Sequence, residues 1–184
     1  MNRILKIWSG SVVLILSLAI FAAAPAWGQE LAVPGYPAAK DVPGAKQLPN
    51  PATSYKVVFD IGTAAASPDK LNPGLAGVAK FVNTLAKYGV PKEHRKVAIV
   101  IHQKATPIVL DDQAYAARFG GAHNPNIALI QSLTRAGVAF HVCGQGVLAN
   151  HIEPKTIQPE IQLDLWALTT MVDLETEGYI HFSE

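Results

Sequence analysis

Cysteine is almost absent from this 184-residue chain, which contains only Cys143. One thiol cannot form a disulfide within the chain, so a disulfide-stabilised scaffold is excluded. There is no Cys-x-x-Cys and no histidine pair at helical spacing, so no metal site is indicated. The sequence also has no Gly-x-Gly-x-x-Gly after its first predicted strand and no Gly-x-Ser-x-Gly elbow. Dinucleotide binding and serine hydrolase chemistry are therefore not indicated, and we expect no cofactor.

An excess of charge of one sign is also missing. The chain has 15 Lys and Arg residues against 14 Asp and Glu residues. Such a balanced surface has no basic excess with which to neutralise phosphates. We therefore expect no nucleic acid and no acidic surface as a partner.

Long apolar runs are limited to the amino terminus. Arg3 and Lys6 precede an uncharged stretch over residues 7–27, which ends in small residues. This pattern predicts a secretory signal peptide over residues 1–28, cleaved after Gly28 or, as second choice, after Ala26. The alternative is an uncleaved anchor, because a run of roughly 20 apolar residues can cross a bilayer. The alanine and proline at its end favour cleavage, so we expect a periplasmic or secreted protein without a membrane segment.

A proline-rich lead-in over residues 29–54 follows, and it either lies against the folded domain or stays mobile. Residues 55–184 then alternate between strand and helix patterns. Strands are predicted over residues 55–60, 97–101, 138–142, 161–165 and 179–182, and helices over 75–86, 127–134 and 166–177, with a single turn at 146–150. We expect Leu168, Met171, Val172 and Leu174 on the buried side of the last helix. Alternation of this kind predicts an α/β fold, a three-layer α/β/α sandwich with an about five-stranded parallel sheet.

Polar side chains stand where the first three predicted strands end. These are Asp60, His102 and Cys143. The carboxyl ends of parallel strands share one edge, so neighbouring strands would bring these three side chains into one crevice. We predict that Cys143 is the reactive residue, that His102 tunes the protonation of its thiol and that Asp60 is a binding residue of the crevice. The opposing interpretation is that Cys143 is a small buried apolar residue, as free cysteines often are.

Three residues after the cysteine are further binding candidates: Gly144, Gln145 and Gly146. Their backbone N–H groups would point back at the sulfur and stabilise a thiolate. The missing side chains of the two glycines would leave room for a second molecule to reach the sulfur.

The other histidines receive structural interpretations. His141 lies inside the third strand and is interpreted as a core or interface residue, and His123 as a solvated loop residue. The remaining three, His94, His151 and His181, are interpreted as surface residues or strand filler.

Residues 137–145 read Gly-Val-x-Phe-x-Val-Cys-Gly-Gln, and they stand with the segments 56–60, 81–83, 96–102, 124–126 and 178–179. Together these segments resemble the DsrE/DsrF-like family of small sulfur-handling proteins, in its secreted branch. The resemblance covers about residues 55–182, and residues 137–145 are its most specific part. It implies a five-stranded parallel sheet, assembly into trimers or hexamers, and a cysteine matching Cys143 that carries sulfur as a persulfide. This chain departs from the relay proteins, which work in the cytoplasm, and it has no charged docking patch.

Three functions remain open at this point. The leading hypothesis is a periplasmic sulfur carrier, or a sulfurtransferase-like protein, that exchanges sulfur with a donor or acceptor protein. The second is a non-catalytic oligomeric module that binds a small ligand. The third is a thiol or redox sensor that dimerises through Cys143.

Overall fold

The computed structural model describes residues 31–183, so the predicted signal peptide lies outside the described residues. Within that range, no helix combines the length and the apolar character that crossing a bilayer requires.

Five strands form one parallel sheet. They are β1 (Tyr55–Ile61), β2 (Arg95–Ile101), β3 (Ala139–Cys143), β4 (Ile161–Asp164) and β5 (Ile180–Ser183), in the spatial order β4-β3-β2-β1-β5. Every neighbouring pair is parallel. The predicted five-stranded parallel sheet is therefore confirmed, and the first three strands are neighbours as the site hypothesis requires.

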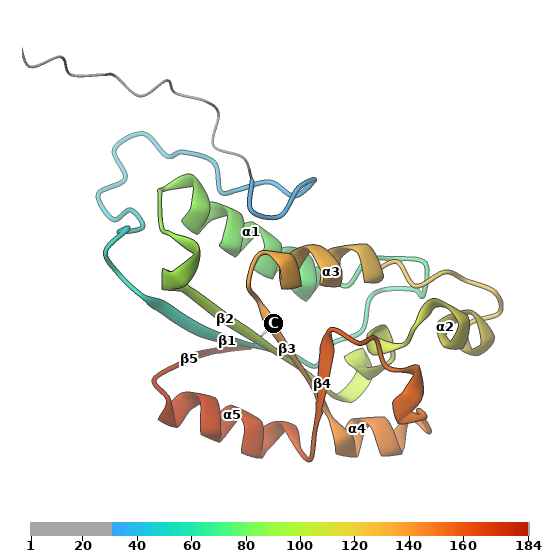
Figure 1. Ribbon diagram of the computed structural model, residues 1–184. Helices are drawn as coiled ribbons and strands as arrows, with labels where there is room; N and C mark the ends of the chain where they lie inside the picture. Colours follow the sequence, from blue (N-terminus) through green and yellow to red (C-terminus); the bar gives the residue numbers. More distant parts are fainter. Residues whose placement is uncertain (1–30, 184) are drawn as a thin grey trace, which may run out of the picture.

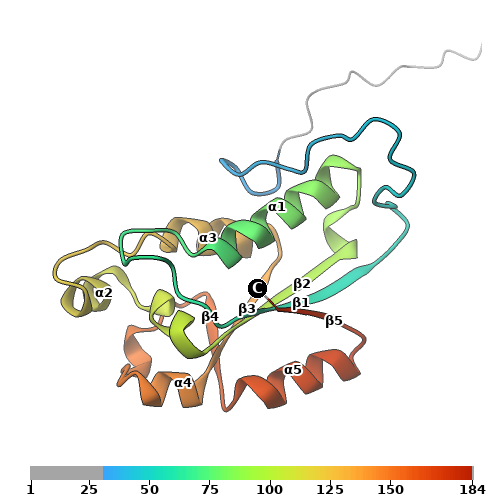
Figure 2. The same cartoon turned by 180° about the vertical axis from the view of Figure 1, so that it is seen from behind.

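Helices cover both faces of the sheet (Figures 1 and 2). On one face lie α1 (Pro73–Lys87) and α3 (Ile127–Arg135), and on the other lie α4 (Gly144–Ala149) and α5 (Ala167–Thr176). The three-layer α/β/α sandwich predicted from the sequence is therefore confirmed.

Several short elements had no signal in the sequence. They are α2 (Asp112–Arg118) and three 3₁₀ segments, η1 (Lys92–His94), η2 (Gln103–Val109) and η3 (Pro154–Thr156). Proline lies inside η2, and α2 is only about two turns long. Neither is long enough to show the apolar repeat from which a helix is predicted.

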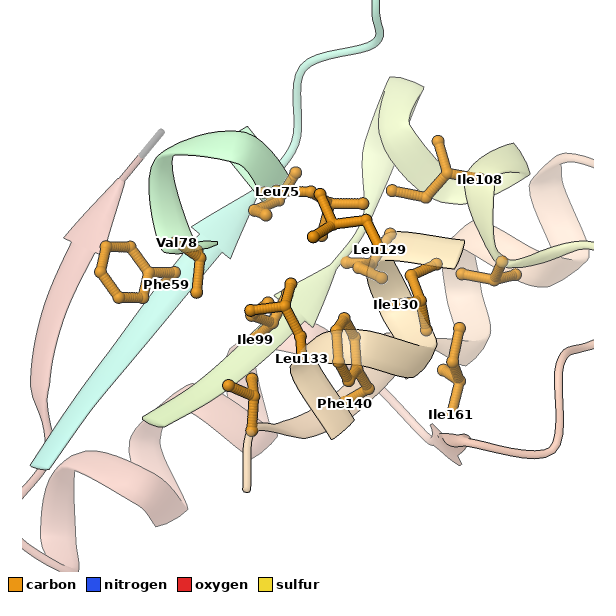
Figure 3. Close-up of a cluster of buried hydrophobic side chains, with 14 of the residues drawn as sticks. Phe59, Leu75, Val78, Ile99, Ile108, Leu129, Ile130, Leu133, Phe140 and Ile161 are labelled. Carbon is orange, nitrogen blue, oxygen red and sulfur yellow. The ribbon is translucent and has the colours of Figure 1, made fainter. Parts of the chain in front are cut away.

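The main core fills the space between the sheet and the layer of α1 and α3 (Figure 3). Ile99 and Phe140 point from the sheet into this layer, where they meet Leu75 of α1 and Leu133 of α3. Fully burying a side chain of this size stabilises the fold by about 1.5–3 kcal/mol. Most of the apolar burial of the domain therefore lies on this face.

The opposite face carries a much smaller apolar cluster. It consists of Val58, Ala98, Val100, Cys143, Ala167 and Met171. The prediction for α5 was partly wrong, because Leu168 and Val172 are exposed and the helix turns Ala167 and Met171 inward. On this face the small apolar surface of Val58, Ala98 and Val100 packs against Ala167 and Met171 of α5.

Asparagine side chains position α1 and the segment before the sheet. Asn72 caps α1, with Oδ1 accepting from the backbone N–H of Gly74 at 3.0 Å, and its own N–H donates to Asn126 Oδ1 at 2.8 Å. Asn126 directly precedes α3, but its side chain makes no capping hydrogen bond there. The lead-in over residues 31–54 lies against α1, where Asn83 binds the backbone of the fully buried Val33.

Candidate functional site

The connections after β2 and β3 leave the sheet toward opposite faces. The chain after β2 leads to α3, whereas the chain after β3 leads to α4 on the other face (Figure 1). In open α/β sheets, ligands bind at such a point, outside the carboxyl ends of the two strands. Cys143 ends β3, and the pairing of Ile101 with Val142 places His102 level with it. Two of the predicted site residues therefore stand side by side along the sheet at the expected edge.

Cys143 lies beneath the first turn of α5. The residue is only 5% exposed, and its Sγ accepts the backbone N–H of Ala167 at 3.3 Å. Ala167 is the first residue of α5, so the sulfur faces the positive end of a ten-residue helix. This arrangement stabilises a negatively charged sulfur more than a neutral one.

The amide that donates to the sulfur is not one of those expected. Cys143 precedes α4 directly, but its side chain makes no capping hydrogen bond to the start of that helix. The three residues Gly144, Gln145 and Gly146 form the first turn of α4, and Gln145 Nε2 donates to the Leu165 carbonyl at 3.2 Å. In the described part of the chain, the hydrogen bond to the sulfur therefore comes from α5 and not from the turn after β3.

Gly144 and Gly146 have a packing role that the sequence analysis did not predict. A Cβ at Gly144 would lie 2.6 Å from the Asp164 carbonyl oxygen, and a Cβ at Gly146 would lie 2.7 Å from Thr106 Oγ1. The missing side chains therefore admit neighbouring segments of the same chain. Access of a second molecule to the sulfur stays a prediction.

His102 is bound to Asp60. Its Nε2 is hydrogen-bonded to Asp60 Oδ1, and the ring lies over Gly62, where a Cβ would be 3.1 Å from Nε2. Asp60 Oδ2 lies 3.6 Å from His181 Nε2, and His181 Nδ1 lies 3.1 Å from Glu175 Oε1. His181, which we interpreted as surface or filler, thus joins β5 and α5 to this pair. No hydrogen bond joins His102 to Cys143 among the described residues, and their coupling stays a prediction.

A second histidine–aspartate pair flanks Cys143 on its other side. His141 Nδ1 lies 2.8 Å from Asp164 Oδ2, which also accepts the Thr170 hydroxyl at 2.9 Å. Gln162 Nε2 donates to the other oxygen, Oδ1, at 2.7 Å. Asp164 itself pairs with Cys143 across β3 and β4. The sequence analysis missed this pair, although Asp164 ends its strand at the same edge and His141 precedes the cysteine by two residues.

His123 is a solvated loop residue in the structure, as interpreted. Its Nδ1 lies 2.7 Å from Asp112 Oδ2. This hydrogen bond raises the pKa of His123 and lowers the pKa of Asp112. Within residues 31–183, no group of three or more His, Cys, Asp and Glu side chains is arranged to hold a metal ion.

Two hollows are lined by residues next to Cys143 but not by Cys143 itself, and both contain Leu163, Asp164 and Leu165. The hollow of about 450 Å³ lies between β4 and α5, where His141, Thr170, Asp173 and Glu177 are among its lining residues. The other, of about 290 Å³, is lined by Gly144, Gln145 and apolar side chains. A third cavity of about 180 Å³ between the β1–α1 loop and α2 contains none of the predicted site residues. The first two hollows are therefore the ones lined by neighbours of Cys143, Asp164 across the sheet in both and Gly144 along the chain in the smaller one.

The model of the DsrE/DsrF-like family matches residues 56–183. The chain belongs to this family. Among solved structures, a protein of unknown function from Methanobacterium thermoautotrophicum, MTH1491, is similar at 16% identity with a TM-score of 0.51. The similarity covers 71% of this chain and 99% of that one, and at this identity it shows a common fold alone. The comparison with curated proteins found no match.

Proposed function

We propose that this DsrE/DsrF-like protein is an exported sulfur carrier that holds sulfur as a persulfide on Cys143. Membership of a family of sulfur-handling proteins supports a role related to sulfur relay. The observation that carries the proposal is the hydrogen bond from the Ala167 amide to Cys143 Sγ at the carboxyl edge of the sheet. An amide at a helix N-terminus stabilises the anionic forms of both the thiol and the persulfide.

The chemistry requires no cofactor. The Cys143 thiolate attacks the outer sulfur of a donor persulfide, forming a bond to that sulfur, while the bond between the two donor sulfurs breaks. The donor leaves as a thiolate, and an acceptor thiol later removes the sulfur from Cys143 by the same reaction.

The direct test is intact mass spectrometry after incubation with thiosulfate or a small-molecule persulfide. We expect the wild-type protein to gain the mass of one sulfur atom and to lose it with dithiothreitol. Cys143→Ser should show no gain under the same conditions. A wild-type protein that gains no sulfur from any of these donors contradicts the proposal.

A second candidate is a non-catalytic module that binds a small ligand, and the burial of Cys143 favours it. The residue is 5% exposed and packs among Val100, Ala167 and Met171. The rate of Cys143 alkylation by iodoacetamide, measured against pH, separates the candidates. A thiol that is merely packed reacts slowly at every pH at which the protein stays folded. The same burial argues against the third candidate, a sensor that dimerises through Cys143.

We further propose that the chain is exported and then cleaved. The uncharged run after Lys6 and the small residues before Gln29 support this. We expect mature protein that begins at Gln29, or at Trp27 as second choice. Amino-terminal sequencing that finds Met1 intact in a membrane fraction would contradict this prediction.

Self-association is the third part of the proposal, with a homotrimer or homohexamer expected. Exposed apolar side chains on α5 and in the segment before it support it, since Leu168 and Val172 lie one turn apart on the same face of the helix and grouped apolar side chains are typical of an interface. Leu165 and Trp166, directly before α5, are exposed as well, as are Leu163 of β4 and Ile180 and Phe182 of β5 at the two edges of the sheet. We expect light scattering to give the mass of a trimer or hexamer at micromolar concentration and Val172→Glu to lower it. A monomeric wild-type protein would overturn the expectation.

A further inference from the structure

His141 and Asp164 are close neighbours of Cys143 in the sheet, and the proposed function has so far given them no role. Residues alternate between the faces of a strand, so His141 and Cys143 lie on the same face of β3, about 6.6 Å apart along it. Asp164 is the direct partner of Cys143 across the β3–β4 pairing. A thiol, an imidazole and a carboxylate therefore share one corner of the sheet.

The carboxylate fixes the imidazole in a single tautomer. Asp164 accepts from Thr170 and Gln162 in addition to its contact with His141 Nδ1. An ionised carboxylate is only an acceptor, so Nδ1 carries the proton and Nε2 keeps its lone pair. Nε2 has no hydrogen-bond partner among the described residues, and His141 lines the hollow of about 450 Å³ between β4 and α5. The free nitrogen is thus available to accept a proton.

His102 is differently placed. It directly follows β2 and is level with Cys143, but its Nε2 is bound to Asp60, which also contacts His181. The ring lies over Gly62, the residue directly after β1, and β1 is on the far side of β2 from Cys143. Its ring is therefore held toward β1, whereas His141 and its aspartate flank the cysteine on β3 and β4.

We propose that His141 is the proton acceptor for Cys143, acting through one water, and that Asp164 is its positioning residue. This inference rests on the proposed sulfur-carrier function and assigns the proton step within it. The Cys143 thiol gives its proton to His141 Nε2, while the Ala167 amide stabilises the sulfur anion. The anion then bonds to the outer sulfur of the donor persulfide, and the bond between the two donor sulfurs breaks. The departing thiolate takes the proton from His141, so the exchange needs no oxidant or reductant.

Other charged or titratable groups lie near His141 and Cys143. Asp173 of α5 and Glu177, directly after that helix, line the same hollow as His141, and Asp164 lines it from β4. On the other side, Cys143 is flanked by His102, the residue directly after β2. The assignment therefore has to be tested by substituting the rival imidazole as well as His141.

The experiment measures the rate of sulfur loading from glutathione persulfide by intact mass, from pH 6 to 10. We expect His141→Gln to slow loading about a hundredfold at pH 7, because general-base assistance is lost. The rates should converge above about pH 9, where a thiol ionises without help. Asp164→Asn should give a smaller loss with the same pH dependence. His123→Gln, which breaks an exposed histidine–aspartate pair in a loop, is the matched control and should leave the profile unchanged.

A wild-type profile in His141→Gln, or a hundredfold loss that follows His102→Gln instead, overturns the inference. If wild-type protein takes up no sulfur, the proposed carrier function fails, and the pH profile of iodoacetamide labelling still decides whether His141 assists the thiol. If His141→Gln does not fold, NMR titration of the His141 ring in wild type and in Cys143→Ser replaces it. A shifted titration midpoint supports the pair, and an identical one overturns it.

Discussion

Asn83→Ala is expected to detach residues 31–41 from the domain and to lower the free energy of unfolding by about 2–4 kcal/mol. Asn83 Oδ1 accepts the Val33 N–H at 2.8 Å, and Nδ2 donates to the carbonyls of Val33 at 2.9 Å and Tyr36 at 2.8 Å. Alanine would leave three backbone groups without partners in a buried place. Detachment lets water satisfy these groups, so the loss is limited to the docking energy, which includes the burial of Val33.

Hydrogen exchange of residues 31–41 measures the detachment, and chemical denaturation measures the loss in the free energy of unfolding. Thr84→Ala is the matched control on the same helix, since Thr84 Oγ1 accepts a single hydrogen bond, from the Ala39 N–H at 2.8 Å. We expect it to cost about 1 kcal/mol and to leave Val33 protected. Full protection of Val33 in Asn83→Ala would contradict the role given to the asparagine.

Gly144→Ala is expected to destabilise the protein by about 2–3 kcal/mol and to speed alkylation of Cys143. Alanine would favour the helical conformation of α4 by about 1 kcal/mol. Its Cβ, however, would lie 2.6 Å from the Asp164 carbonyl oxygen and 3.1 Å from that of Leu165, and overpacking against backbone costs more than this gain. The displaced segment leads directly into Ala167, so the cover over the sulfur moves with it.

Gly146→Ala provides the comparison, because its Cβ would meet a side chain, Thr106 Oγ1, at 2.7 Å. The double variant with Thr106→Ala should therefore recover stability relative to the sum of the two single changes. Adding Thr106→Ala to Gly144→Ala should not recover stability. Denaturation midpoints and iodoacetamide labelling rates check both statements, and a fully stable Gly144→Ala would refute the close approach.

Much of the fold follows from local pattern. The uninterrupted apolar run of β2 and the repeat of α1 bury the same residues in the structure that the pattern predicted. The last helix was harder, because Leu168 and Val172 are as apolar as any core residue. Which stripe faces inward depends on the width of the patch on the sheet, and a local repeat contains no information about that patch.

The candidate site was predictable in position but not in its pairings. Strand ends placed Asp60, His102 and Cys143 at one edge, and the register confirms this arrangement. The partners of each side chain depend on rotamers and on segments distant in sequence. The donation from Ala167 to Cys143 and the contact between His141 and Asp164 join residues 24 and 23 positions apart. No sequence spacing indicates such contacts.

The unequal packing of the two faces has a consequence for how Cys143 reacts. The layer of α5 rests on the small cluster around Val58 and Met171, whereas α1 and α3 cover the main core. Parts of a protein with few buried contacts open locally at a smaller free-energy cost than global unfolding. We therefore expect the first turn of α5, directly above the sulfur, to open at a lower free-energy cost than α1 and α3. The reaction rate of the thiol would follow the opening equilibrium of that turn rather than the exposure of Cys143 in the closed structure.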